Sequence, residues 1–284
     1  MPFTPTYPVP EERKPYTLIA DQNEGNGRIG CLMLHGFMGS PYSSRPMADY
    51  LVTQGITMHC HLLSGHGHWP DKLYKVPHQR WLEEAEEGLV RIRELADEVF
   101  LIGHSMGTVM GAHLAAKYKD IRGMVMLTPL YDIPDKRLTV MPFLRYVMPW
   151  FYPHMLRSMH DLMKQRMLDF DPTLDLDDPA VQAQIPKMTR VPTSGLAEMI
   201  KMVKYGRQFW SQLTLPVLIF QGGDDPAVPS ETMAKIYNML PSKHKELKTF
   251  PEAGHELMRP FEPVHTQVWQ LIRDFFHTYS HSGA

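Results

Sequence analysis

The chain has 284 residues, 43% of them hydrophobic, and is long enough to bury one large core, or a core with a substantial insertion. Twenty-nine Lys and Arg residues stand against 31 acidic ones, and this net charge of −2 excludes a basic surface that would recruit nucleic acid or an anionic membrane. The chain has two cysteines, Cys31 and Cys60, and no apolar run with the length of a membrane span or a signal peptide. We therefore expect a cytoplasmic protein with reduced core thiols and no integral membrane segment.

Short apolar runs alternate with helical stretches through the first 129 residues. Strands are expected at 16–20, 28–34, 56–63, 99–102 and 124–127. Helices are expected at about 44–53, with Gly55 as its stop, at 79–95, and from Ser105 to about 117–119. This alternation predicts an α/β fold with a doubly wound, mostly parallel sheet.

The alternation stops at Pro129 and resumes at Leu215. The residues between them are rich in Met, Pro and aromatic side chains, and two helices are expected there. One of them carries a stripe of methionines spaced four apart, and the other runs from about 194 to 210; the stripe consists of Met155, Met159, Met163 and Met167. After it, strands are expected at 216–221 and 247–250, and helices at 231–240 and 264–279. We therefore expect a core made of 1–129 and 215–284, with a mainly helical cap, 130–214, inserted between two strands.

The pentapeptide Gly103-His104-Ser105-Met106-Gly107 places a serine between two glycines, after a buried strand and before a helix. A serine on such a turn can be held in a strained conformation with its hydroxyl exposed, and the glycines remove Cβ atoms that would collide with neighbouring elements. The pattern therefore predicts a nucleophile elbow with Ser105 as the nucleophile.

A serine nucleophile needs a base, an acid that orients the base, and donors for an oxyanion. His255 directly follows the last expected strand, and Asp224 and Asp225 follow the strand at 216–221. Because the carboxyl ends of parallel strands meet at one crevice, all of these residues are expected to converge on Ser105.

Five motifs in this order resemble the α/β-hydrolase superfamily, and within it the carboxylesterases and monoacylglycerol lipases. The motifs are His35-Gly36-Phe37, Gly65-His66-Gly67, the elbow at 103–107, Gly222-Gly223-Asp224-Asp225-Pro226-Ala227-Val228 and Ala253-Gly254-His255. The resemblance selects Asp225 over Asp224 as the acid and implies the triad Ser105, Asp225 and His255. It also implies an oxyanion hole made by the backbone N–H groups of Phe37 and Met106, and it requires no cofactor.

The apolar character of the cap favours a small lipophilic ester as substrate, such as a short- to medium-chain acyl ester or a monoacylglycerol. The cap side chains expected to contact it are Met148, Trp150, Phe151, Met155 and Met159. The same triad would also serve a peptidase, a thioesterase or a carbon–carbon hydrolase, and a non-catalytic binding protein is a further alternative. The sequence leaves the oligomeric state open, a homodimer included.

Four histidines, His59, His61, His66 and His68, cluster around the strand at 56–63 and the loop after it. Their spacing does not match that of zinc sites, and no acidic ligand is near them in the sequence, so no metal site is expected. We expect them to form part of the crevice wall.

Overall fold

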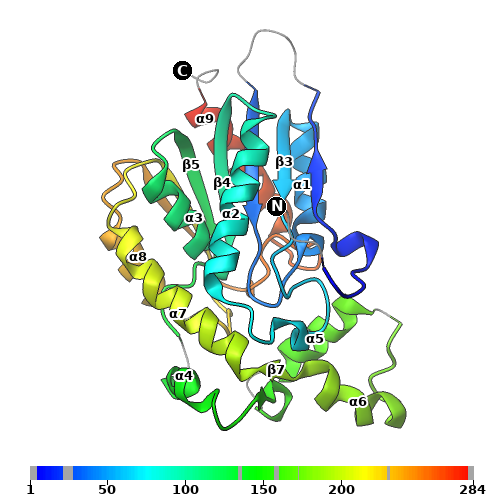
Figure 1. Ribbon diagram of the computed structural model, residues 1–284. Coiled ribbons are helices and arrows are strands. Elements are labelled where there is room, and N and C mark those ends of the chain that lie inside the picture. Colours follow the sequence, from blue (N-terminus) through cyan, green and yellow to red (C-terminus); the bar gives the residue numbers. More distant parts are fainter. Residues whose placement is uncertain are drawn as a thin grey trace.

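The computed structural model describes residues 5–21, 28–133, 136–156, 160–171, 173–228 and 231–280, and its centre is a seven-stranded sheet (Figure 1). The strand order is β1-β3-β2-β4-β5-β8-β9, in which β1 is antiparallel to β3 and all other neighbours are parallel. The strands are β1 (Tyr16–Leu18), β2 (Ile29–Leu34), β3 (Ile56–Cys60), β4 (Glu98–His104), β5 (Ile121–Leu127), β8 (Val217–Gly222) and β9 (Lys245–Phe250). The mostly parallel sheet expected from the alternation is confirmed.

The inner strands are buried along their whole length, as expected for a sheet covered on both faces. Cys31 on β2 and Cys60 on β3 are fully buried free thiols. Some strands begin or end a few residues from the expected positions. Strand β3 ends at Cys60 rather than at 63, and β5 begins at Ile121 rather than at 124. The turn expected at 24–27 lies outside the described residues.

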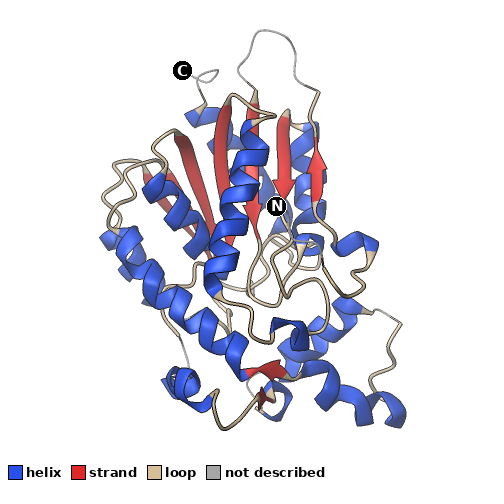
Figure 2. Ribbon diagram, viewed as in Figure 1, coloured by secondary structure: helices blue, strands red, loops and turns tan. Residues whose placement is uncertain are grey.

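Helices cover both faces of the sheet (Figure 2). One apolar cluster contains residues of α2 (His78–Arg93), α3 (Met106–Lys117) and α8 (Glu231–Met239), and the other contains residues of α1 (Arg45–Thr53) and α9 (His265–Tyr279). Each helix agrees with an expected one to within a few residues. Gly55, at φ +82°, takes the left-handed conformation that glycine adopts most readily after a helix end.

Residues 130–214, which we call the cap segment, form four α-helices and a two-stranded pairing in their described part. These are α4 (Met141–Leu144), β6 (Trp150–Phe151), α5 (His160–Phe170), α6 (Pro179–Thr189), β7 (Val191–Pro192) and α7 (Thr193–Trp210). Figure 1 places α4, α5, α6 and β7 beyond the end of the sheet towards which the parallel strands run. The helix expected at 194–210 is α7.

The expected methionine stripe is only partly helical. Met163 and Met167 lie on α5 and are buried, whereas Met155 precedes α5 and is 75% exposed. Met159 lies outside the described residues. Helix α6 was not anticipated, although its start follows a familiar pattern, because the Asp178 carboxylate accepts the N–H of Ala180 and Pro179 occupies the first helical position.

Glu198 on α7 joins the cap segment to the sheet domain. Its carboxylate lies 2.7 Å from His78 Nδ1, at the start of α2, and 2.8 Å from a guanidinium nitrogen of Arg145 in the cap segment. Lys201 Nζ also donates to it, at 2.7 Å. Burial raises the pKa of Glu198, yet these three hydrogen-bonding partners lower it to about 2. The carboxylate is therefore charged at neutral pH and pins α7 to the core.

Within the described ranges, no helix has the combination of length and apolar composition needed to cross a bilayer.

Candidate active site

Ser105 occupies the turn between β4 and α3 in a conformation that few L-residues adopt, with φ 52° and ψ −118°. Its backbone N–H donates to the carbonyl of Leu127 at 2.9 Å, which fixes the turn against the neighbouring strand. A Cβ on Gly103 would lie 2.6 Å from Thr108 Cα, and one on Gly107 would lie 1.9 Å from the carbonyl oxygen of Leu34. Both glycines are therefore required by close backbone approach, as the elbow pattern predicts.

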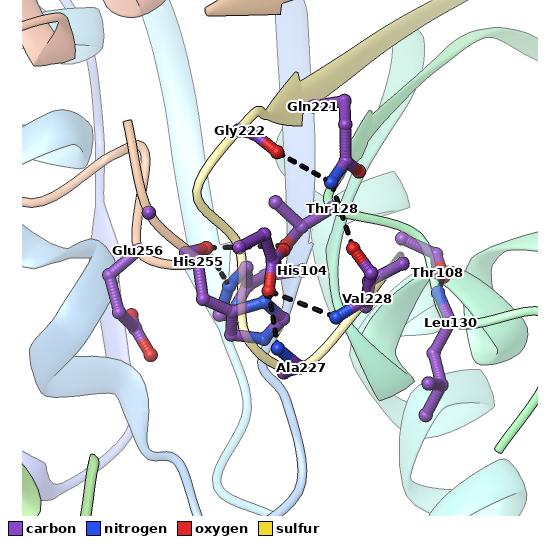
Figure 3. A network of polar contacts seen from close by, with 12 residues as sticks. His104, Thr108, Thr128, Leu130, Gln221, Gly222, Ala227, Val228, His255 and Glu256 are labelled. Atoms are coloured by element: carbon purple, nitrogen blue, oxygen red, sulfur yellow. Dashed lines mark hydrogen bonds and ion pairs between the residues drawn. The ribbon is translucent and has the colours of Figure 1, made fainter. Parts of the chain in front are cut away.

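Asp225 lies on the loop after β8 with a fully buried side chain. Its Oδ1 accepts the N–H groups of Ala227 and Val228 at 2.7 and 3.0 Å, and its Oδ2 lies 2.8 Å from His255 Nδ1. Two further hydrogen bonds stabilise the loop, because Gln221 Nε2, near the end of β8, donates to the carbonyls of Gly222 and Val228 (Figure 3). Asp224, the other aspartate that the sequence offered as the acid, is exposed.

His255 lies on the loop after β9, and its orientation is fixed at both ends. Since a carboxylate only accepts, the Nδ1 facing Asp225 carries a proton, which leaves Nε2 of the neutral ring as the basic nitrogen. The backbone carbonyl of His255 accepts from His104 Nε2 at 3.1 Å and from the Thr128 hydroxyl at 3.3 Å (Figure 3). Burial lowers the pKa of His104, which keeps its ring neutral beside that of His255.

The two proposed oxyanion donors belong to the loop after β2 and to the start of α3. Met106 is the first residue of α3, where backbone N–H groups have no acceptor within the helix. Phe37 follows Gly36 on a loop shaped by His35, whose Nδ1 donates to the carbonyl of Gly36 at 3.0 Å and whose Nε2 accepts the N–H of Leu63 at 3.2 Å. Burial lowers the pKa of His35 to about 4, so this bridging tautomer is neutral.

Three of the four described residues other than glycine with positive φ follow the parallel strands β2, β4 and β5. They are Met38 at 59° on the loop after β2, Ser105 at 52°, and Thr128 at 44° after β5. Such conformations cost on the order of 1–3 kcal/mol each and persist only where the surroundings impose them. At this end of the sheet the surrounding structure therefore holds the backbone in conformations that it would not adopt on its own.

An apolar pocket of about 140 Å³ opens beside Ser105 and His255. Its walls come from the loop after β2, the chain after β5 and the cap segment. The lining residues are Phe37, Met38, Leu130, Ile133, Leu138, Phe151, Pro153, Arg166, Val191, Leu196, Met199 and Ala227.

A second pocket, of about 50 Å³, also reaches Ser105 and His255, and most of its lining side chains are polar or charged. Sequence reasoning missed its charged residues, Arg13, Arg166, Glu256 and Arg259, which come from three distant parts of the chain. Only Glu256 carried a signal, its position next to His255. Burial raises the pKa of Glu256, but the guanidiniums of Arg166 and Arg259 are among the neighbours that lower it by more, so this pKa lies below its ordinary value.

Among the cap side chains expected to contact a substrate, Phe151 lines the apolar pocket. Trp150 instead stacks on Tyr74, with ring centroids 6.0 Å apart, and carries the guanidinium of Arg190 on its ring at 4.1 Å. Met148 and Met155 are exposed and line neither pocket, because the chain around them lies on the outside of the cap segment. Met159 lies outside the described residues.

Three of the four clustered histidines do not line either pocket at Ser105. His59, His61 and His66 are buried, so the expectation of a crevice wall is wrong for them. His68 is partly exposed and lines a further small pocket, which shares Arg13 and Arg166 with the second pocket at Ser105. Within the described part of the chain, no group of three or more His, Cys, Asp or Glu residues could hold a metal ion.

Comparisons with known proteins identify the family and the fold of the chain. The profile of the family described as "Serine aminopeptidase, S33" matches residues 26–263. The chain is 26% identical to a thermostable monoacylglycerol lipase of Bacillus sp. (strain H-257), over 81% of this chain and 84% of that protein. It is 22% identical to a carboxylesterase of Bacillus subtilis (strain 168), over 87% and 93% of the two chains. A solved structure of metagenome-derived lipolytic enzymes, LipS and LipT, shares the fold with a TM-score of 0.75, at 20% identity over 95% of this chain and 100% of that one.

Proposed function

Since the chain belongs to the serine aminopeptidase S33 family of α/β-hydrolases, we propose that it is a serine carboxylester hydrolase with Ser105, His255 and Asp225 as its triad. The observation that carries the proposal is the pairing of His255 Nδ1 with Asp225 Oδ2, at 2.8 Å, because His255 lines the same two pockets as Ser105. That pairing fixes the tautomer a general base needs.

The mechanism is acyl transfer in two steps. Ser105 Oγ attacks the ester carbonyl while His255 Nε2 takes its proton, and the oxyanion is stabilised by the N–H groups of Phe37 and Met106. The tetrahedral intermediate collapses, the C–O bond to the alcohol breaks, and His255 returns the proton to the leaving oxygen. Water then repeats the sequence on the acyl-enzyme, which releases the carboxylic acid and restores Ser105.

The apolar pocket supports an aliphatic acyl group as the part of the substrate that the protein buries. Its volume of about 140 Å³ suits a short or medium chain, and Leu196 and Met199 of α7 are among its apolar lining residues. The relatives named as a monoacylglycerol lipase and a carboxylesterase support the same substrate class, a small lipophilic ester. The mechanism needs no cofactor.

Activity of the Ser105→Ala variant tests the proposal. We expect the wild-type protein to hydrolyse p-nitrophenyl butyrate and to be labelled at Ser105 by a fluorophosphonate, and the variant to do neither. Ser211→Ala, at an exposed serine after α7, is the matched control and should retain both properties. Hydrolysis by the Ser105→Ala variant at the wild-type rate would overturn the assignment.

The family description makes peptide substrates the main competitor. A panel of p-nitrophenyl acyl esters, monoacylglycerols and aminoacyl arylamides separates the two readings. We expect the esters to have the higher kcat/KM, and a strict preference for the arylamides would favour a peptidase instead.

We also propose a cytoplasmic location, which the two buried free thiols support, because such thiols persist in reducing compartments. A homodimer is a further proposal from the sequence. The mass of the purified protein in solution tests it, because a dimer has twice the mass of the chain.

A further inference from the structure

Ser105 lies where two pockets of opposite character meet. The apolar pocket extends towards α7, while the polar pocket extends between the loop after β2 and the loop after His255. Phe37, Met38, Ser105, Arg166 and His255 line both of them. An ester bound at Ser105 therefore has one substituent in apolar surroundings and the other among charged side chains.

The polar pocket has more positive than negative lining groups. Its described lining contains three guanidiniums, of Arg13, Arg166 and Arg259, against the single carboxylate of Glu256. Arg13 and Arg259 are each only 8% exposed. Buried guanidiniums cannot lose their charge, so a pocket with this lining favours an anionic occupant.

Aromatic rings help to hold two of these guanidiniums at the pocket. The guanidinium carbons of Arg13 and Arg259 lie 5.2 and 4.9 Å from the centroid of the Tyr42 ring. Arg13 also lies 4.8 Å from the centroid of Phe170, and Arg259 5.3 Å from that of Phe261. Cation–π contacts orient a guanidinium without removing its charge.

Arg166 brings the third guanidinium from the cap segment to the catalytic loops. Its Nη1 donates to the carbonyl of Met38 at 2.9 Å, and its Nη2 lies 4.0 Å from Glu256 Oε1. Its Nε is buried and has no hydrogen-bond partner among the described residues. A buried donor without a partner is costly, and an acceptor on a bound ligand would satisfy it.

We propose that the polar pocket binds an anionic group on the alcohol portion of the substrate, so that the preferred ester has an aliphatic acyl chain and an alcohol bearing a carboxylate or phosphate. This inference rests on the proposed esterase activity. The reaction is the same hydrolysis, in which water adds across the acyl C–O bond and the anionic alcohol leaves with the proton donated by His255. The small volume of the pocket, about 50 Å³, suits a compact head group rather than a second chain.

Four decanoyl esters that differ in the charge of the alcohol test the proposal with the wild-type protein. They are 1-decanoylglycerol, its 3-phosphate, its 3-carboxylate counterpart decanoylglycerate, and decanoylcholine, all used below their micellar concentrations. We expect kcat/KM for at least one anionic ester to exceed that for the neutral ester about tenfold or more, and the cationic ester to be the poorest. The two anionic esters distinguish phosphate from carboxylate as the natural group.

The outcomes separate the two proposals. If none of the four esters is cleaved, the proposed function itself fails. If the neutral and cationic esters are cleaved with the same kcat/KM as the anionic ones, the esterase assignment stands and the anionic subsite is overturned.

Single variants at Arg166 and Arg259 locate the effect. Arg259→Gln and Arg166→Gln should each lower the ratio of anionic to neutral kcat/KM, while Arg259→Lys, which keeps the charge, should restore part of the ratio. Arg91→Gln, at an exposed arginine of α2 that lines neither pocket, is the matched control. If both glutamine variants fold, as judged by circular dichroism, and both keep the wild-type ratio, the arginines do not read the charge and the proposal is wrong.

Discussion

The imidazole of His104 donates from Nε2 to the backbone carbonyl of His255, at 3.1 Å. The two rings are 4.9 Å apart, so the residue before the proposed nucleophile supports the main chain of the proposed base. Thr128, after the next strand, donates to the same carbonyl at 3.3 Å. Through this shared acceptor, the ends of β4 and β5 together set the position of the His255 loop.

Removing one donor from this carbonyl should lower the rate more than it lowers binding. Thr128→Val keeps the shape of the side chain and deletes its hydroxyl, and we expect kcat to fall about fivefold with KM little changed, because a net hydrogen bond contributes about 1 kcal/mol. Steady-state kinetics on p-nitrophenyl butyrate measures both constants. Thr278→Val, at an exposed threonine of α9 that donates to Asp274, is the control. An unchanged kcat in a folded Thr128→Val protein would show that the carbonyl needs no second donor.

The adjacent aspartates should differ sharply in their effect on catalysis. Asp225→Asn replaces the acceptor facing His255 Nδ1 by an amide that can present a donor there, and we expect a loss of kcat of about 10⁴-fold, as for the wrong imidazole tautomer. Asp224→Asn, one residue earlier and exposed, should stay within about twofold of wild type, because surface substitutions rarely matter. Equal losses in the two variants would contradict the choice of Asp225.

The buried histidines should make the protein sensitive to acid. Burial lowers the pKa values of His35 and His59 from 6.5 to about 4, and that of His66 well below 6.5. The unfolded chain therefore binds these protons at a higher pH than the folded protein does, so the free energy of unfolding falls as the pH drops from about 6.5 towards 4. Each such histidine contributes a slope approaching about 1.4 kcal/mol per pH unit.

Urea titrations at several pH values measure this slope. His59→Asn keeps an amide near the position of Nδ1, which faces the Thr17 hydroxyl, and removes the titrating ring, so the slope should decrease. His277→Asn, at an exposed site on α9, controls for the loss of a histidine. A stability independent of pH between 6.5 and 4 would contradict the assignment of neutral buried rings.

Neither thiol should react while the protein is folded. Burial raises the pKa of Cys60 to about 12 and that of Cys31 well above its ordinary value, so almost no thiolate exists at pH 8. We expect iodoacetamide to label neither cysteine in the native protein, and both in urea. Rapid labelling of the native protein would mean that β2 and β3 open locally at this point.

The sequence was informative where a residue has to lie at the end of a parallel strand. Gly103, Ser105 and Asp225 lie at or just after the end of a short apolar run, and His255 follows the last strand; a parallel sheet brings such positions to one edge whatever the loops between them do. The elbow glycines, Gly103 and Gly107, could also be predicted, because the close approach of neighbouring backbone excludes any residue with a Cβ. These features depend on local pattern and on a single topological rule.

The cap segment and the polar pocket depend on contacts that no local pattern encodes. Met155 shares its spacing with Met163 and Met167, yet it lies before α5 and faces solvent. Arg13 comes from the segment before β1 and reaches the site because it packs on Tyr42 and Phe170, two residues far from it in the chain. The composition of residues 130–214 indicated an apolar cover, but it could not indicate which side chains would face Ser105.

The strained turns at Met38, Ser105 and Thr128 have a consequence for how this protein can change over time. A glycine at any of these positions would remove the backbone strain. Substitutions to glycine there should therefore accumulate if thermal stability alone were selected. The side chains at Met38, Ser105 and Thr128 are therefore expected to be kept by selection for catalytic activity. Laboratory evolution for heat tolerance alone should yield variants with a higher Tm and a lower kcat, with substitutions concentrated at this end of the sheet.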